Sequence, residues 1–356
     1  MICDWMTVSQ DHGALHDLEF VDDLYIKLDR DGTIQREYAS PTRFSGSHST
    51  SIGIKCHNGV VSFNGNIGRF GRSNNVDNLN VDQTKDCINW FMRCLGLPEF
   101  TSGYHGSTAE LISDGDPDRE KRLESVNFGA KVHRIDLTGN YSVGCPKNAR
   151  ELLWHLSGLN HGRQKTGVYG DAETITVGAG SRDIFQKIYI KSVEMQAHRK
   201  KTGVENDLIE DVHADGVVRY ELELKQATNR LGVRKWEQCT QEKCEKIYET
   251  YRSKAMDQNE VITDAALESA HLKTYSLYKQ GYNVRNYMSR ATFYRHRNAI
   301  KSATGEDISN SRNRKGPATK VISVSPYNVR EQYRCDMSQV MASIQESVTG
   351  ALGVYH

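Results

Sequence analysis

Several common functional signatures are absent from this sequence of 356 residues. Its eight cysteines are scattered and form no CxxC pair or Cys/His cluster, which argues against a zinc site. No GxxxxGK(S/T) phosphate loop is present, which argues against ATP hydrolysis. No run approaches the roughly 18 apolar residues of a membrane span, and the start lacks a secretion signal. These absences predict a cytoplasmic protein with reduced thiols and no membrane partner.

An excess of one charge sign is also absent, since 46 Lys and Arg face 45 Asp and Glu, for a net charge of +1. This balance argues against a protein that coats nucleic acid by bulk electrostatics. The charges are nevertheless unevenly spread. Residues 1–24 hold six carboxylates and no Lys or Arg, whereas residues 285–320 hold nine Lys and Arg and two acids, for a net +7. A basic segment near the C-terminus is therefore a candidate for DNA contact.

The hydrophobic pattern predicts an α+β domain over residues 1–232 and a mainly helical domain over residues 233–356. Asn58-Gly59 between two alternating runs indicates a hairpin at residues 51–63. Because the strands and helices alternate irregularly, we expect an antiparallel sheet with helices on one face. Further helices are predicted at 81–95, 146–159 and 192–201, and strands at 131–144, 174–177, 183–191 and 217–225.

The helical domain contains a pattern typical of a helix-turn-helix, with a basic last helix at residues 289–305. Ser289 suits the N-cap and Gly305 the stop of that helix. We expect Phe293, Ile300 and the stem of Arg297 to face inward, with His296 outside. The structural alternative is a solvated basic helix. The predicted DNA contacts are Arg290, Thr292, Arg295, His296 and Arg297.

Two of the predicted strands carry residues with the chemistry of phosphoryl transfer. On strand 183–191, alternation places Tyr189 and Lys191 on one face, where a cation can stabilise a phenolate, although such a pair is commonly only an amphipathic surface. On strand 131–144, Arg134 and Asp136 share a face. They form either a structural ion pair or a metal ligand beside a phosphate contact.

Strand 217–225 adds Arg219, Glu221 and Glu223 on one face, a pattern that usually marks the wet side of a half-buried sheet. If Asp136, Tyr189 and Glu221 converge on one sheet surface, they form a site with a divalent metal and a nucleophile. Sequence alternation alone leaves that convergence open.

Taken together, these segments resemble the replication initiators of filamentous phages, the gene II/X family. The resemblance covers roughly residues 50–325 and consists of several motifs in the family order. They are GNIGRF (65–70) with NNV (74–76), RIDLT (134–138), TITVGAGS (174–181) with IYIKSVE (188–194), VRYELELK (218–225) and TFYRHR (292–297).

The resemblance implies a rolling-circle initiator: a site-specific nuclease that uses Mg²⁺ or Mn²⁺ to nick one origin strand through a 5′-phosphotyrosine and later rejoins it. Double-stranded origin DNA and single-stranded DNA are then the partners in the bacterial cytoplasm, with host helicase and polymerase, and a homodimer could form on the DNA. By motif position, Tyr189 is the nucleophile, Lys191 its stabilising cation and Asp136 the first metal ligand. The weaker ligand candidates are Glu194 and Glu221, and the phosphate contacts are Arg69 and Arg134.

One departure from the wider superfamily concerns the metal, because no His-x-His motif occurs among the thirteen histidines. A carboxylate-rich site is expected instead. Two other functions remain open. A non-catalytic helix-turn-helix regulator would use the sheet only as a platform, and a tyrosine recombinase would carry its tyrosine on a helical domain near the C-terminus.

Overall fold

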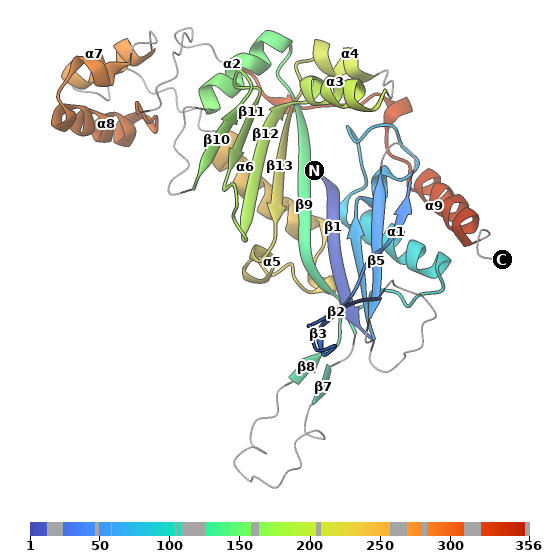
Figure 1. Cartoon of the computed structure of the whole chain (residues 1–356). Coiled ribbons are helices and arrows are strands. Elements are labelled where there is room, and N and C mark those ends of the chain that lie inside the picture. Colours follow the sequence, from blue (N-terminus) through green and yellow to red (C-terminus); the bar gives the residue numbers. More distant parts are fainter. Residues whose placement is uncertain are drawn as a thin grey trace. The chain divides into compact units, whose positions relative to one another are not determined.

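A computed structural model gives the fold, in two compact units (Figure 1). The first unit comprises Met1–Thr138, Glu223–Ile247 and Val329–His356, and the second Gly139–Leu222 and Tyr248–Asn328. The division at residue 232 stays a prediction. The structure describes residues 1–12, 24–46, 50–57, 59–103, 105–107, 125–157, 164–203, 208–256, 269–279, 283–309 and 322–352.

The first unit is built on an antiparallel sheet in the order β9-β1-β6-β5-β4. Strand β1, which pairs with β9 on one side and β6 on the other, was not predicted. Register shifts at Cys3/Trp5 and Thr7/Val8 interrupt the alternation of apolar and polar residues along β1, so the period of two residues that is typical of a strand cannot be recognised in the sequence. The strands are β1 (Ile2–Asp11), β4 (Thr42–Ser45), β5 (Ser51–His57), β6 (Val60–Gly65) and β9 (Lys131–Ser142).

The predicted hairpin and the helix that follows it are confirmed. His57 pairs with Val60 across the turn, where Gly59 has a φ of 75° that suits glycine. Helix α1 (Val81–Cys94) begins with a capping box between Asn80 and Gln83. Its stripe of Cys87, Ile88 and Phe91 is buried, and the Phe91 ring lies 5.3 Å from that of Phe44 in β4. Helix α1 therefore covers one face of this sheet.

The second unit contains strands in the order β10-β11-β12-β13. They are β10 (Thr166–Tyr169), β11 (Thr174–Val177), β12 (Ile184–Ile190) and β13 (Val218–Leu224), accompanied by α2 (Pro146–Leu156), α3 (Lys191–Thr202) and α4 (Leu208–Ala214). The predicted strands and helices are confirmed with one correction. Lys191, predicted as the last residue of strand 183–191, belongs to α3, because the chain turns into a helix directly after Ile190.

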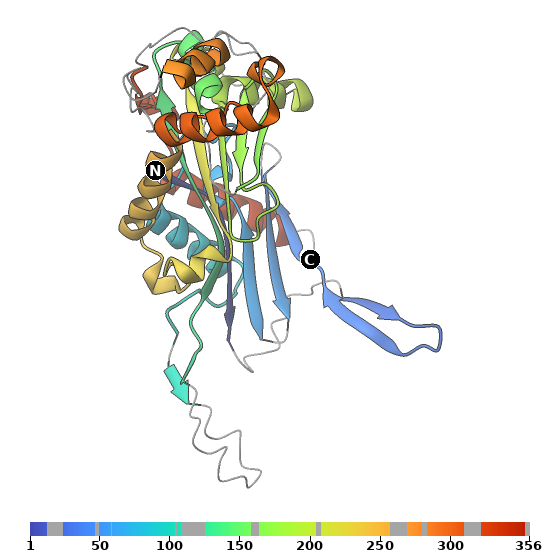
Figure 2. The same ribbon diagram turned by 90° about the vertical axis from the view of Figure 1, so that its left-hand side faces the viewer.

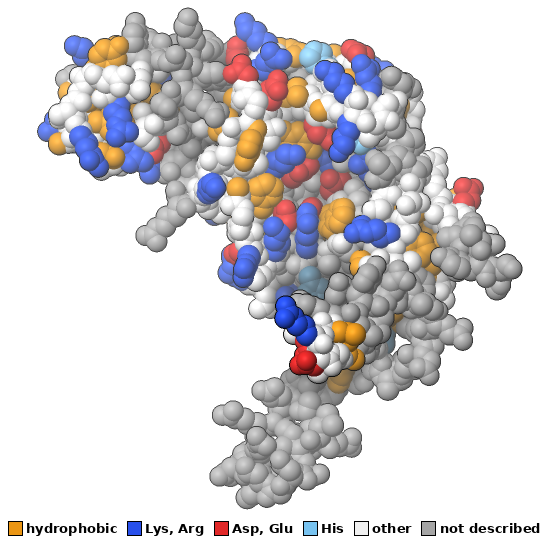
Figure 3. All heavy atoms as spheres, viewed as in Figure 1, with side chains coloured by type: hydrophobic (Ala, Val, Ile, Leu, Met, Phe, Trp, Pro, Cys, Tyr) orange, Lys and Arg blue, Asp and Glu red, His pale blue; other side chains and the backbone are white. Residues whose placement is uncertain are grey.

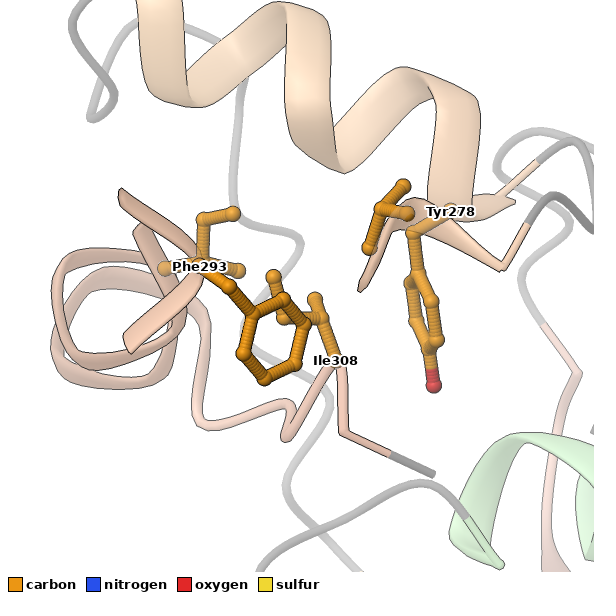
Figure 4. Close-up of a cluster of buried hydrophobic side chains, with 5 residues drawn as sticks. Tyr278, Phe293 and Ile308 are labelled. Atoms are coloured by element: carbon orange, nitrogen blue, oxygen red, sulfur yellow. The ribbon is translucent and has the colours of Figure 1, made fainter. Parts of the chain in front are cut away.

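Helices α7 (Ser269–Lys279) and α8 (Arg290–Thr304) contact each other, with η5 (Val284–Tyr287) between them in sequence. Ser289 caps α8 by accepting a hydrogen bond from the Thr292 N–H, and Gly305 ends it at a φ of 70°. A small apolar core joins the two helices, and Figure 4 shows its members pointing toward one another. The core consists of Tyr278, Val284, Phe293, Ile300 and Ile308.

The remaining elements lie around these sheets and helices. Hairpin β2–β3 extends away from the sheet of the first unit (Figure 2), while α9 contacts α1 and accepts a hydrogen bond from the Trp90 indole at the Met341 carbonyl. Residues 310–320 of the basic segment 285–320 lie outside the described residues. The elements are β2 (Leu24–Leu28), β3 (Ile34–Ala39), η1 (Ile67–Arg69), β7 (His105–Ser107), β8 (Ser125–Asn127), α5 (Ala227–Arg230), η3 (Trp236–Gln238), α6 (Gln241–Met256), β14 (Ser325–Pro326), η6 (Glu331–Tyr333) and α9 (Met337–Leu352).

The prediction of an α+β fold with an antiparallel sheet, helices and a helical C-terminal part is confirmed. None of the described helices combines the length and the apolar character needed to cross a membrane.

Candidate active site

Tyr189 lies near the end of β12 and donates a hydrogen bond across to β13. Its phenolic oxygen is 2.7 Å from Oε1 of Glu221. The side chain is only 3% exposed, and this burial raises the pKa of the Tyr189 phenol well above its ordinary value. Arg219 opposes that shift, while the Glu221 charge adds to it. The tyrosine is thus a neutral phenol whose proton already points at a carboxylate.

Cations surround the Tyr189–Glu221 pair. Arg219, which is fully buried, lies two residues before Glu221 on β13, with its Nε 3.2 Å from Glu221 Oε1. The ammonium of Lys187 stands 4.1 Å from the centre of the Tyr189 ring. Sequence analysis missed Lys187, although its spacing of two from Tyr189 on a strand was a usable signal. These cations would stabilise the negative charge of a phosphate that binds next to the phenolic oxygen of Tyr189.

Lys191 and Glu194 form a separate pair at the start of α3. The Lys191 ammonium is 2.6 Å from Glu194 Oε2 and 5.9 Å from the centre of the Tyr189 ring. Burial raises the pKa of the Glu194 carboxyl, but Lys191, Arg219 and Lys187 together outweigh burial, so that the pKa lies below its ordinary value. Lys191 is fully buried and forms an ion pair with Glu194, and its role as the stabilising cation of Tyr189 stays a prediction.

In the first unit, Arg134 and Asp136 on β9 form the two-pronged ion pair that was one of the two expectations. Arg134 Nε donates to Asp136 Oδ1 at 2.8 Å and Nη2 donates to Oδ2 at 2.6 Å. Arg134 Nε also lies 3.3 Å from Glu223, and the guanidinium carbon is 5.4 Å from the centre of the Trp5 ring. Burial raises the pKa of Asp136 to about 7, against the lowering effect of Arg134. The convergence of Asp136 on Tyr189 stays a prediction.

The predicted carboxylate ligands are each held by another group in this structure. Asp136 accepts from Arg134, Glu194 from Lys191, and Glu221 from Tyr189. Across the described part of the chain, no group of three or more His, Cys, Asp or Glu side chains is arranged to hold a metal ion. The residues as placed therefore do not fit a Mg²⁺ or Mn²⁺ centre.

The first predicted phosphate contact, Arg69, lies half-buried at the end of η1, where its backbone N–H donates to the Asn66 side chain. Nearby Arg72 donates to the carbonyls of Asp77 at 2.8 Å and Tyr333 at 3.0 Å. Hydrogen bonds from Arg72 thus connect the glycine-rich segment around Arg69 to the C-terminal part of the chain at Tyr333. A role of Arg69 in DNA binding stays a prediction.

The basic helix α8 presents only part of the predicted DNA-binding set to solvent. Arg290 and Arg295 are exposed and Thr292 is half-buried. The expectation that His296 lies outside is wrong, because it is buried and its Nδ1 is 2.7 Å from Thr274 Oγ1 on α7. The Arg297 guanidinium is engaged by Asp307 through two hydrogen bonds. Contacts of α8 with α7 and with the segment that follows α8 therefore use two residues that the helical pattern assigned to DNA.

The chain was also compared with known proteins. Residues 4–242 match the family described as the N-terminal part of the phage replication-associated protein encoded by gene II. The replication-associated gene II protein of Enterobacteria phage I2-2 is 25% identical over 339 residues, which covers 85% of this chain and 89% of the phage protein. A rolling-circle replication initiator protein from Geobacillus stearothermophilus, a solved structure, is 13% identical with a TM-score of 0.23, over 63% of this chain and 73% of that chain. A structural likeness this weak supports no statement about the site.

Proposed function

The chain belongs to the family of phage replication-associated proteins of the gene II type, and from this premise we propose that it starts rolling-circle replication by nicking one strand of a double-stranded phage origin. Tyr189 is the nucleophile in this proposal. The observation that carries it is the hydrogen bond from the Tyr189 hydroxyl to Glu221, with Lys187 and Arg219 beside the pair. A phenol becomes an effective nucleophile when a base accepts its proton and cations stabilise the charge.

In the nicking step, the Tyr189 oxygen forms a bond to phosphorus as the bond from phosphorus to the 3′-oxygen breaks. The phenolic proton passes to Glu221, and the departing 3′-oxygen takes a proton from solvent. The products are a 5′-phosphotyrosyl link and a free 3′-OH, which host helicase and polymerase would use. Attack by a 3′-OH on the same link reverses these bond changes and rejoins the strand without ATP.

In this proposal, residues 1–232 nick the strand and residues 233–356 bind the double-stranded origin. Arg290, Thr292 and Arg295 on α8 are the side chains offered to DNA, because His296 and Arg297 are engaged within the helical part. Helix α8, held against α7 by the apolar core of Figure 4, would act as the second helix of a helix-turn-helix.

The test compares two tyrosines on the same pair of strands. Tyr189→Phe should lose both nicking of supercoiled origin plasmid and covalent attachment to DNA, assayed with Mg²⁺ or Mn²⁺. Tyr220→Phe is the matched control, because Tyr220 is also buried and its hydroxyl donates across to Gln186 at 2.8 Å. Each change removes one side-chain hydrogen bond, worth about 1 kcal/mol for the neutral Tyr220–Gln186 pair and about 2 kcal/mol for the bond from Tyr189 to a carboxylate. Nicking by Tyr189→Phe at the wild-type rate would refute the assignment.

One observation favours the second function, a non-catalytic DNA-binding regulator. Tyr189 is 3% exposed, so a phosphate can reach its oxygen only if DNA binding uncovers it. A regulator needs the basic helix α8 but not the Tyr189 hydroxyl. If wild-type protein binds origin DNA yet forms no covalent complex, and Tyr189→Phe binds equally well, the regulator is the correct function.

A further inference from the structure

The face of the first-unit sheet opposite α1 carries two rows of side chains that no catalytic role explains. Antiparallel register places the members of each row directly opposite one another on adjacent strands, so their side chains share one face. Figure 3 shows basic and acidic side chains gathered on the face of the strands turned toward the viewer. The amide row is Arg43, Gly53, Asn64, Thr7 and Arg134, and the hydroxyl row is Lys55, Ser62, Ser9 and Lys131.

Each row has a cation at both ends and uncharged residues between them. Neither row contains an acid, although Arg134 is paired with Asp136 and Glu223 from outside the row. Arg43 and Lys131 are exposed and Lys55 is half-buried; among the described residues, none of the three makes an ion pair. With strands 4.7–4.9 Å apart, the five-strand amide row is about 19 Å wide. Such a strip suits an extended polyanion.

Asn64, at the centre of the amide row, is exposed and yet fixed in orientation. Its Oδ1 accepts two hydrogen bonds, from the Trp5 indole Nε1 at 2.9 Å and from Thr7 Oγ1 at 2.7 Å. These two hydrogen bonds fix the orientation of the side-chain amide. Its Nδ2 group then presents two N–H donors to a ligand. A surface amide held this way loses little side-chain freedom on binding a ligand.

Trp5 supplies an aromatic surface beside the amide row. It lies on β1 two residues before Thr7, on the same face, and is partly exposed. Nucleic-acid bases that are not paired in a duplex stack on such side chains, and the phosphates bind neighbouring amides and cations. A duplex hides its base faces, so a partly exposed tryptophan within a polar strip favours a single strand over double-stranded DNA.

We propose that the two rows bind single-stranded DNA without base specificity, with Trp5 stacking on a base and the Asn64 amide donating to the strand. This extends the proposed function by naming a surface that holds the displaced or nicked strand, and rests on that function only for its biological purpose. Binding itself does not require nicking, which allows the two proposals to fail separately.

The test measures binding of the full chain to a 15-nucleotide oligo(dT), a probe without origin sequence, by tryptophan fluorescence and by anisotropy of labelled oligo(dT). Trp5→Ala should weaken binding by about 5- to 150-fold, as loss of a stacking side chain does. Trp5→Phe should remove most of the fluorescence change while keeping much of the affinity. Trp90→Phe is its control, because the Trp90 indole is bonded to the Met341 carbonyl away from the rows.

Asn64→Asp tests the amide most sharply. Aspartate keeps an oxygen to accept from Trp5 and Thr7 but loses the N–H donors and adds a negative charge, so binding should weaken at least tenfold. Asn229→Asp makes the same charge change at an exposed position outside the rows and should bind as wild type does. Arg43→Glu, at the exposed end of the amide row, should weaken binding and flatten its salt dependence. Thermal unfolding checks that each variant is folded.

Several outcomes separate the proposals. Equal affinities of Asn64→Asp and Asn229→Asp, or unchanged affinity in folded Trp5→Ala and Arg43→Glu, would overturn the single-strand surface. Wild-type protein that nicks origin plasmid but fails to bind oligo(dT) would overturn it as well, leaving the nicking proposal intact. Wild-type protein that binds oligo(dT) through Trp5 and Asn64 but never forms a covalent complex supports this surface and overturns the nuclease.

Discussion

Replacing Glu221 by glutamine tests the proton transfer on which the nicking proposal depends. The glutamine side chain would still offer an oxygen to the Tyr189 hydroxyl, now 2.7 Å from Glu221 Oε1, but it could not accept the proton. A positioned general base typically contributes 10²- to 10⁴-fold to rate, so covalent-complex formation should slow by about that factor. The change also removes the negative charge that lies 3.2 Å from the Nε of fully buried Arg219. Because Glu221 itself is 25% exposed, the free energy of unfolding should fall by about 3 kcal/mol.

The assay follows single-turnover formation of the protein–DNA adduct on a denaturing gel, with a labelled single-stranded origin oligonucleotide, well below the melting temperature of each variant. Glu223→Gln is the matched control. It lies two residues further along β13, and its charged partners are Arg134 and Lys225 at 3.3 and 2.8 Å. The free energy of unfolding of Glu223→Gln should fall by about 1 kcal/mol or less, because those partners are 36% exposed. The variant should form the adduct at the wild-type rate. Adduct formation by Glu221→Gln within threefold of wild type would refute the role of Glu221 as base.

Three further predictions concern the helical part and the metal. Hydrogen bonds from Arg297 and Ser309 outweigh burial and lower the pKa of Asp307 to about 2, so this pair stabilises the fold fully above pH 4 and progressively less as the pH falls toward 2. Asp307→Asn should accordingly cost up to about 2 kcal/mol at pH 7 and only a small part of that at pH 2, where about half of the carboxyl is protonated, measured by urea unfolding at both pH values. Arg295→Ala should weaken binding to duplex origin DNA and lower the salt slope by about 1, whereas an unchanged slope would place Arg295 away from phosphate. Removal of divalent metal by EDTA should leave oligo(dT) binding unchanged, and it tests the metal requirement that the family resemblance implies, because nicking that persists in EDTA would exclude that requirement.

The sequence predicted those parts of the fold whose periodicity is uninterrupted. Hairpin β5–β6 has an Asn-Gly turn and α1 a continuous apolar stripe, and both were found as expected. Strand β1 was missed because two register shifts interrupt its alternation. Lys191 was placed on the wrong element because an apolar run says little about where a strand gives way to a helix. His296 faces the exposed side in a helical count, yet a bond to Thr274 on α7 draws it inward, which only the tertiary contact could reveal.

The sequence predicted residues of the candidate site, but it did not predict how they contact one another. Tyr189 and Glu221 were identified on separate strands, but the bond between them depends on the order and register of β12 and β13, which no local pattern encodes. The same two strands place Tyr220 on the other side, where its hydroxyl donates to the neutral amide of Gln186 and its ring lies 5.3 Å from that of Tyr248 on α6. Both tyrosines are buried and both are hydrogen-bonded across the pair. Since an amide oxygen cannot hold a phenolic proton at neutral pH and a carboxylate can, only Tyr189 has a partner that could accept its proton during attack on a phosphate.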